Sequence, residues 1–334
     1  MVTMSDVARL AGVSTMTVSN VVNDRSGVSD TVRERVRRAI AESGYRMNVS
    51  ARNLRSGASG VIGLAVPELN RPYFGALAAR VTQWARKHGY RVVVEETGAR
   101  VEGEIAAIQL SHALDYDGLL LSPVGLDLER ELVRAGSRPL VVLGERPAPS
   151  GYDHVALPNS EGTEAVTRLL LERGARRVAL VRGRSGSGED MLSLRHKGYR
   201  RALDAAGLTA APELLLEIGP LDMASGREAA HRALDSGLDA DAFFAVTDTV
   251  AFGVIRGLAD RGVRVPDDVL VAGFDDLEES EYFVPSLTSV SPDLDWTAQH
   301  AVELLLARVR GEGGPSGRIV APFDVVERES TRGR

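Results

Sequence analysis

The sequence contains no cysteine, which excludes a disulfide framework and any metal or redox site built on thiolates. It also lacks a long apolar run, since no segment approaches the roughly 20 residues that a helix needs to cross a bilayer. The N-terminus has no succession of basic, apolar and small residues such as an export signal requires. We therefore expect a cytoplasmic protein with no membrane partner.

Acidic residues are in excess, and the net charge of -6 disfavours nucleic acid if it is averaged over the chain. The distribution is uneven, however: residues 1–60 hold nine arginines against five acids, which leaves -10 for the remainder. A small basic head on an acidic body suits phosphate contact at one end only. For some arginines between residues 33 and 38, a solvated helix face is the alternative. The length of 334 residues suggests two or three domains.

The first two dozen residues predict two short helices joined by a tight turn. Thr3 and Asp6 resemble a capping box, and Gly12 suits the end of the first helix. Ser14 can cap a second helix over residues 15–22, whose valines would pack on the first. This pattern is a helix-turn-helix.

In such a motif the start of the second helix enters the major groove of DNA. Asn20 can pair with an adenine edge and Met16 can press on a thymine methyl group. Ser14 and Thr17 can hold phosphate oxygens. Taken alone, a generic helical hairpin with solvated polar residues is the alternative. The head residues expected at DNA are Ser14, Thr15, Met16, Thr17, Asn20, Asn23 and Ser29.

Ser29 can also cap a third helix, which Gly44 would end. The following polar segment can form a helical turn or two but has little to bury, so it is marginal alone in water. Arg52 and Arg55 suit the phosphates of a DNA minor groove, and Leu54 suits a wedge between base pairs. An ordinary flexible linker is the alternative.

The run DVARLAGVSTMTVSNVVN, followed by VSDTVRERVRRAIAESGYRMNVSARNLRSG, closely resembles the DNA-binding head of the lactose-repressor/galactose-repressor family of bacterial transcription regulators. The resemblance implies that the segment after the third helix is a hinge helix and that Leu54 is its intercalating leucine. The chain departs from the family at Asn20, where members often carry a basic residue.

Beyond residue 60, short apolar runs alternate with helical stretches, which predicts βαβ units and parallel sheets. The predicted strands are 61–66, 91–94, 118–121 and 140–143, then 178–181, 214–218, 243–246 and 269–272. The predicted helices are 74–87, 102–114 and 128–135, then 160–173, 194–206, 224–236 and 249–261. The restart of the pattern indicates two lobes, to which 288–290, a helix at 294–309 and a strand at 318–326 are expected to return.

We therefore predict an N-terminal all-α helix-turn-helix head and an α/β core of two doubly wound parallel-sheet lobes. The resemblance implies that this core is similar to periplasmic sugar-binding proteins. The expected divisions are 1–46 for the DNA-binding domain, 47–59 for the hinge, 60–158 with about 291–320 for the N-lobe, and 159–290 with about 321–334 for the C-lobe.

Ligands of open parallel sheets bind at the carboxyl ends of the strands, here between two hinged lobes. An aromatic pair after the first strand can stack on a ring or a sugar face, and an arginine with two carboxylates in the second lobe suits vicinal hydroxyls. The candidate effector residues are Asn70, Tyr73, Phe74, Arg195, Asp248 and Asp275. The last three fall on family positions that often contact effector. A core role for Phe74 and a structural pair of Arg195 with Asp275 are the alternatives.

Leu221 stands where several sugar-responsive relatives place a stacking aromatic residue, so a purine or other metabolite is the alternative to a sugar-like effector. The loop GRSGSGED lacks the P-loop lysine and the dinucleotide-binding spacing, and we interpret it as a flexible rim.

The six histidines show no metal-ligand spacing, and no nucleophile elbow occurs, so we expect no catalysis, metal or cofactor. An α/β enzyme and a free-standing solute-binding module are the alternative classes. We predict a repressor that binds a palindromic DNA operator as a homodimer under the control of a small-molecule effector. Both an inducer and a corepressor fit this sequence. The final ERESTRGR has no heptad segment for a tetramerising helix.

Overall fold

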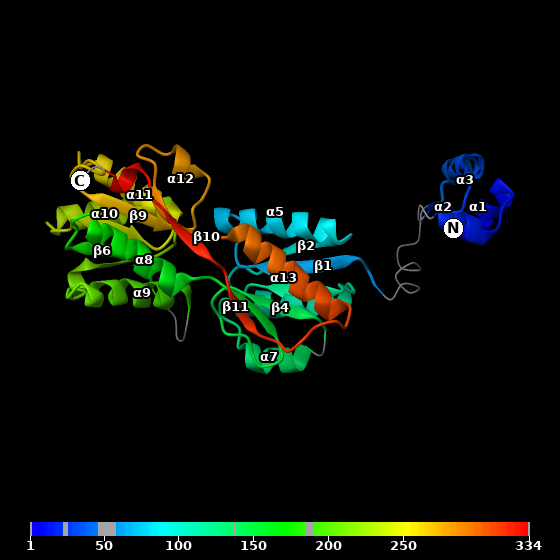
Figure 1. The fold of residues 1–334 in the computed structure, drawn as a ribbon, viewed down its shortest axis with the longest axis horizontal. Helices are drawn as coiled ribbons and strands as arrows, with labels where there is room; N and C mark the ends of the chain where they lie inside the picture. The colour runs from blue at the N-terminus through cyan, green and yellow to red at the C-terminus, as the bar shows by residue number, and fades with distance from the viewer. Residues whose placement is uncertain (1, 23–25, 46–57, 136–137, 185–189, 333–334) are drawn as a thin grey trace. The chain divides into compact units, whose positions relative to one another are not determined.

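The computed structural model describes residues 2–22, 26–45, 58–135, 138–184 and 190–332. It divides into two compact units, Met1–Ser59 and Gly60–Arg334, which we call the head and the core. Figure 1 shows the all-helical head and the two sheet-containing lobes of the core. No helix of the described residues is long and apolar enough to span a membrane.

The described residues of the head form the helices α1 (Met4–Ala11), α2 (Thr15–Val22) and α3 (Asp30–Ser43). The predicted capping box of α1 is confirmed. The Asp6 backbone N–H donates to the Thr3 hydroxyl at 3.3 Å, and the Thr3 backbone N–H donates to the Asp6 carboxylate at 2.9 Å. Gly12 ends α1 with a φ of 61°, a left-handed conformation that glycine adopts at little cost.

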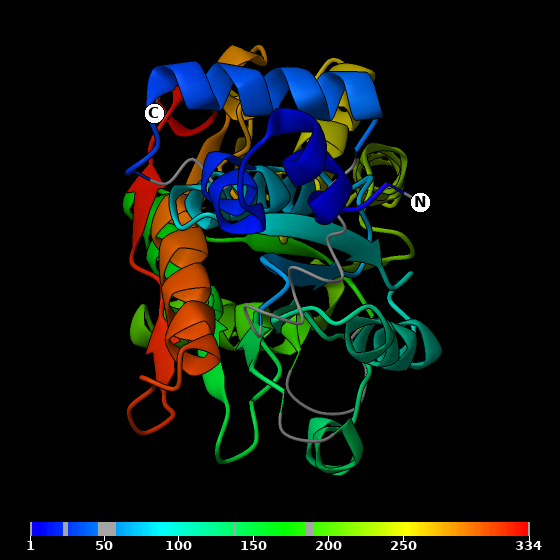
Figure 2. The same cartoon turned by 90° about the vertical axis from the view of Figure 1, so that its right-hand side faces the viewer.

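Small apolar side chains from all three helices form the core of the head: Val7, Ala8, Ala11, Val18, Val21, Val36 and Ala39. Figure 2 shows α3 lying across α1 and α2. Ser29 occupies the N-cap position of α3, and its carbonyl accepts from the Arg33 N–H at 2.9 Å. The prediction of a side-chain cap there is wrong, because the exposed Ser29 hydroxyl makes no capping hydrogen bond.

The N-lobe is built on one six-stranded sheet in the order β11-β5-β4-β3-β1-β2, with all its pairs parallel. Its elements are β1 (Val61–Val66), α5 (Pro72–Lys87), β2 (Arg91–Glu96), α6 (Val101–Ala113), β3 (Gly118–Leu121), α7 (Leu128–Ala135), β4 (Leu140–Leu143), β5 (Asp153–Ala156), α13 (Leu294–Val309) and β11 (Arg318–Val320). Alternate strand residues face opposite sides. Leu120 packs in a cluster with α5 and α13, whereas Leu119 and Leu121 pack on α6.

The C-lobe is built on a second six-stranded sheet in the order β12-β10-β9-β8-β6-β7. Its elements are α8 (Asn159–Glu172), β6 (Val178–Gly183), α9 (Met191–Ala205), η1 (Pro212–Leu214), β7 (Leu215–Ile218), α10 (Met223–Asp235), β8 (Ala242–Ala245), α11 (Asp248–Ala259), β9 (Leu270–Phe274), α12 (Glu279–Tyr282), β10 (Thr288–Pro292), β12 (Phe323–Val326) and η2 (Glu329–Thr331). Helices α8 and α9 cover one face, and α10 and α11 cover the other.

The prediction of one strand over residues 318–326 is wrong. β11 pairs parallel with β5 in the N-lobe, whereas β12 pairs antiparallel with β10 in the C-lobe. Ala321 and Pro322 lie between them, and the chain changes sheets there because proline has no N–H to continue a ladder. β5 was not predicted, because it contains the polar residues Asp153 and His154.

Candidate DNA-binding surface and effector site

The N-terminal end of α2 is the exposed part of the predicted recognition helix. Val18 and Val21 are buried against the rest of the head, and this fixes the rotation of α2. Thr15 is therefore exposed, and Met16 keeps 72% of its surface accessible. Asn20 is half-buried at the edge of the same helix. An apolar side chain and polar groups on a short exposed helix suit contact with base edges.

Ser14 and Thr17 support the start of α2. The Thr17 backbone N–H donates to the Ser14 hydroxyl at 3.1 Å, and the two hydroxyl oxygens lie 2.9 Å apart in a hydrogen bond. Each hydroxyl has further hydrogen-bonding positions, and a DNA phosphate would use these. The other predicted DNA contacts, Asn23, Arg52, Leu54 and Arg55, lie outside the described residues, as does most of the predicted hinge.

Arg195 is the centre of the predicted effector site, on α9 near the junction of the two lobes. Its Nε donates to the Asn159 Oδ1 at 2.7 Å, its Nη2 to the Asp275 Oδ1 at 3.3 Å, and its Nη1 to the Val246 carbonyl. The guanidinium carbon also lies 3.5 Å from the centroid of the Phe274 ring. A guanidinium has five N–H donors, and the hydrogen bonds named above go to three protein partners, so N–H groups remain that can donate to a ligand.

Asp275 directly follows β9 and has a φ of 115°, in a region that favours glycine. Its backbone N–H donates to the Val290 carbonyl at 2.9 Å, which holds this strained turn. Burial raises the pKa of the Asp275 carboxyl to about 7, against the opposing effect of Arg195, and the negative charges of Asp248 and Glu145 raise it further. The predicted pair of Arg195 with Asp275 therefore exists, at a position open to titration.

Asp248 differs from the other candidates, because its carboxylate is fully buried within the C-lobe. Oδ1 accepts from the Ser289 hydroxyl at 2.5 Å, and Oδ2 accepts from the Leu277 N–H at 2.9 Å and the Ser280 hydroxyl at 2.8 Å. Burial raises the pKa of this carboxyl to about 6, and these hydrogen bonds oppose the shift. This geometry argues against direct effector contact, and the carboxylate instead supports the loop that carries Asp275.

Tyr73 brings the N-lobe to the same place. Burial raises the pKa of the Tyr73 hydroxyl, and the carboxylates of Glu145 and Asp275 add to the effect. The hydroxyl is therefore a stable donor. Phe74 meets Tyr73 edge to face, with ring centroids 5.2 Å apart. Asn70 is exposed on the loop before α5.

Two residues that the sequence analysis did not select complete the group. Glu145 follows β4 by two residues, and its Oε1 accepts from the Asn159 Nδ2 at 3.0 Å. The rule used for the other candidates, polar residues just after strand ends, would have found Glu145. Asn159 begins α8 directly after the crossover from the N-lobe, and its preceding strand β5 was not recognised.

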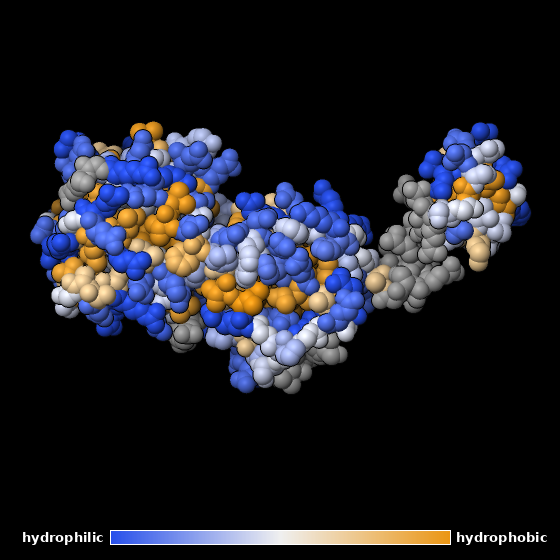
Figure 3. All heavy atoms as spheres, in the orientation of Figure 1, coloured by the Kyte–Doolittle hydropathy of each residue, from blue (hydrophilic) through white to orange (hydrophobic). Residues whose placement is uncertain are grey.

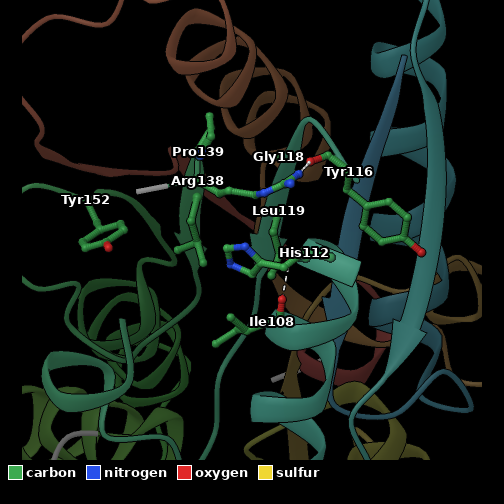
Figure 4. Close-up of a pocket in the computed structure, with 10 residues that line it drawn as sticks. Ile108, His112, Tyr116, Gly118, Leu119, Arg138, Pro139 and Tyr152 are labelled. Atoms are coloured by element: carbon green, nitrogen blue, oxygen red, sulfur yellow. Dashed lines mark hydrogen bonds between the residues drawn. The ribbon is translucent and has the colours of Figure 1, made fainter. Parts of the chain in front are cut away.

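Two hollows in the core lie away from Arg195 and Asp275. A cavity of about 10 Å³, room for one water molecule, lies at the amino ends of β3 and β4. Arg138 spans it and donates to the Tyr116 carbonyl at 2.7 Å, with His112 beside it (Figure 4). A second, open groove of about 520 Å³ lies beyond β7, between Arg184 and Arg232. Among the residues that the structure describes, no group of three histidine or acidic side chains could hold a metal ion.

Comparison with known proteins matches both parts of the chain. Residues 3–48 match the bacterial regulatory proteins of the lacI family, and residues 167–331 match a periplasmic binding protein-like domain. The chain is 30% identical to the HTH-type transcriptional repressor PurR of Vibrio atlanticus over 99% of both proteins. It is 31% identical to the ribose operon repressor of Haemophilus influenzae, over 99% of this chain and 98% of that one.

A solved structure extends the likeness to the whole fold. The lac repressor dimer, bound to operator and the anti-inducer ONPF, matches with a TM-score of 0.85 at 28% identity, covering 99% of both chains. A helix-turn-helix head joined to a two-lobed α/β core is the organisation of a ligand-controlled DNA-binding protein. The chain belongs to the lacI family of bacterial regulatory proteins.

Proposed function

We propose that this protein is a transcriptional repressor that binds a palindromic operator as a homodimer and responds to a small molecule held between its core lobes. The observation that carries the proposal is the hydrogen-bonded group in which Glu145 of the N-lobe meets Asn159, Arg195 and Asp275 of the C-lobe. A DNA regulator acts where the chromosome is, so we place it in the cytoplasm. We assign it no catalytic role.

The effector that fits best is sugar-like. Arg195 and the Tyr73 hydroxyl offer donors, and the carboxylates of Asp275 and Glu145 offer acceptors, which together suit a neutral polyhydroxylated molecule. The names of the ribose operon repressor and the lac repressor agree with this class. Leu221 packs in the C-lobe core and provides no aromatic platform, so a purine or other metabolite stays the alternative.

The homodimer is supported by apolar side chains exposed at the end of α12. Val284 keeps 88% of its surface accessible and Tyr282 keeps 71%. Apolar atoms also reach the surface of the C-lobe beside β12 and above α12 (Figure 3). A second copy would cover such side chains. A twofold dimer presents two heads in inverted arrangement, as a palindrome requires.

The mechanism is thermodynamic linkage between the two sites. If effector binding favours one arrangement of the lobes, it changes the separation of the two hinge segments and hence operator affinity. The coupling free energy in such systems is typically about 1–3 kcal/mol. Release by an inducer and recruitment by a corepressor both follow from this scheme.

Selection of bound sequences from random duplex DNA by the purified protein tests the DNA-binding half of the proposal. We expect enrichment of a palindrome of roughly 16–20 base pairs. Its two half-sites together span about one and a half to two turns of the DNA helix. Selection is run without additive, with a mixture of neutral sugars and with purine bases. Enrichment of no sequence in any of the three would contradict the proposal.

Asp275→Ala tests the effector half. The variant loses a carboxylate acceptor and the partner of Arg195, so we expect at least a tenfold loss of effector affinity for the loss of charged hydrogen bonds. Operator binding without effector should be unchanged. The measurement is operator affinity with and without the sugar or purine that shifts the thermal midpoint of the wild type. A variant that responds normally would show that the site is elsewhere.

A further inference from the structure

A continuous row of hydrogen-bonded polar side chains connects the two lobes. Glu145 belongs to the N-lobe, because it follows β4 in the chain. Asn159, Arg195 and Asp275 belong to the C-lobe and lie on or beside α8, α9 and β9. The bonds run from the Glu145 carboxylate to the Asn159 amide at 3.0 Å, from Asn159 to Arg195 at 2.7 Å, and from Arg195 to Asp275 at 3.3 Å.

Chemistry fixes the orientation of the Asn159 amide in this row. A guanidinium has donors and no acceptor, and a carboxylate has acceptors and no donor. The amide oxygen must therefore face Arg195, and the amide nitrogen must face Glu145. Asn159 is only 1% exposed. An aspartate there would set two carboxylates against each other, and an apolar residue would leave buried charged groups without a partner, which is costly.

Asn159 is also placed where the lobes articulate. It follows Pro158 in the segment that crosses from β5 to α8. The segment between β11 and β12 crosses the lobes beside it, and the Ala321 N–H donates to the Ala156 carbonyl at 2.9 Å. The segment between β10 and α13 is the next crossover, and its Asp293 N–H donates to the Pro322 carbonyl at 2.9 Å. The bond from Asn159 to Glu145 thus adds a side-chain link between lobes at the hinge itself.

We propose that Glu145 and Asn159 form an inter-lobe latch that transmits the state of the effector site to the arrangement of the lobes. A ligand that competes for Arg195 or Glu145 changes the two bonds of the Asn159 amide, and the amide moves with α8. Asn159 is a positioning residue in this scheme, because it acts on effector through Arg195. The proposal rests on the proposed effector site, but its first test does not need an effector.

The test measures the distance between the lobes by double electron–electron resonance. The natural chain has no cysteine, so spin labels can be attached at Leu114→Cys in the N-lobe and Asp204→Cys in the C-lobe, both exposed. Labelled chains are diluted with unlabelled chains, so that an assembly carries one labelled copy. We expect a narrow distance distribution for the otherwise natural protein, and a broader or displaced one for Asn159→Asp and for Glu145→Ala.

The decisive variant is the double exchange Glu145→Gln with Asn159→Asp. The new amide at 145 can donate to the new carboxylate at 159, which still accepts from Arg195, so the natural distribution should return. Glu145→Ala removes the same inter-lobe hydrogen bond by changing Glu145, which is half-exposed, and leaves the buried Asn159 in place. The test therefore stays valid if Asn159→Asp does not fold. Distributions that match the natural one in both single variants would overturn the latch, as would a folded double variant that stays broad.

Operator binding supplies the second readout. A sugar or purine that binds the wild type is added at a concentration that saturates each protein, so that weaker ligand binding does not contribute. Under these conditions Glu145→Ala should reduce the ligand-induced change in operator affinity by about tenfold, the effect expected for one charged hydrogen bond. The double exchange should restore this change. A purely structural role would lower the thermal midpoint and leave the ligand-induced change as it is in the wild type, which would overturn the proposal. Failure of every ligand to bind the wild type would count against the proposed effector site, while the distance measurement would still decide the latch.

Discussion

At the scale of single residues, buried charged side chains are the feature of the core that sets the candidate site apart. Arg195 is 2% exposed, and a guanidinium removed from water must find partners for its N–H groups. Its carboxylate partner Asp275 is held in a strained backbone conformation and has a pKa raised to about 7 by burial. Such strain and such a shift occur together at binding sites more than in ordinary cores. Ligand binding, protonation of Asp275 and a change in the arrangement of the lobes would therefore all alter the same ion pair.

Asp275→Asn should change the pH dependence of stability. The folded-state pKa of about 7 lies above the ordinary aspartate pKa of 3.8, so the folded protein keeps a proton that the unfolded chain has lost. This group therefore destabilises the fold progressively as pH rises through that window, by at most about 1.4 kcal/mol per pH unit. Asparagine has no such proton. Thermal unfolding from pH 4.5 to 7.5 should show a smaller decline for the variant.

Asp248 provides the internal control for this measurement. The pKa of its carboxyl is also raised, to about 6, and it lowers stability with rising pH in both proteins. The difference between the two curves therefore reports the loss of the Asp275 carboxyl together with its electrostatic coupling to Asp248. Parallel curves would mean that Asp275 is already ionised at acidic pH and that Arg195 outweighs burial.

The rule that polar residues just after strand ends lie together selected candidate effector residues, but it could not show which of them are enclosed by the protein. Arg195 and Asp275 of the C-lobe are hydrogen-bonded to each other, and their contact with an effector stays a prediction. Asp248 satisfies the same rule, but Ser280 and Ser289 approach it from far along the chain and enclose its carboxylate. Their approach is a property of the folded lobe and leaves no local pattern. The assignment of the described DNA contacts stays a prediction.

At the scale of elements, the helices and strands of the core follow closely from local pattern. The helix at 294–309 and the strand at 118–121 have the predicted limits. The region 318–326 shows what pattern cannot supply. Its apolar residues indicate extended chain, but the partner of each half is set by the three-dimensional course of the crossovers. The absent N–H of Pro322 was the one local signal of a change of sheet.

The segment at α12 gives a prediction at this scale. Val284→Asp should convert the dimer to monomer at micromolar concentration, because a charge replaces an apolar side chain in the proposed interface. Light scattering measures the mass. Leu114→Asp is the matched control, since Leu114 is 56% exposed at the end of α6 in the N-lobe. A Val284 variant that remains dimeric, or a Leu114 variant that dissociates equally, would place the interface on another surface.

At the scale of the whole molecule, the distribution of charge between head and core matches the roles proposed for them. The head and the predicted hinge are basic, whereas the core is acidic, so attraction to DNA is confined to one end of the chain. The division into head and core was predictable because composition and period change abruptly near residue 60, and the two lobes because the alternation of strands and helices restarts within the core. The inter-lobe contact of Glu145 with Asn159 was not, because it depends on how two separately patterned lobes meet.

Salt dependence tests this division directly. Neutralising one phosphate contact changes the slope of log affinity against log salt by about 0.9, so Arg52→Gln, present twice in a dimer, should make the slope less steep by about 2 on the selected operator. Arg37→Gln is the matched control, because Arg37 is exposed on α3 outside the predicted contacts. We expect its slope to equal that of the wild type. Equal reductions in both variants would indicate a general effect of head charge, and no reduction for Arg52 would remove that residue from the operator interface.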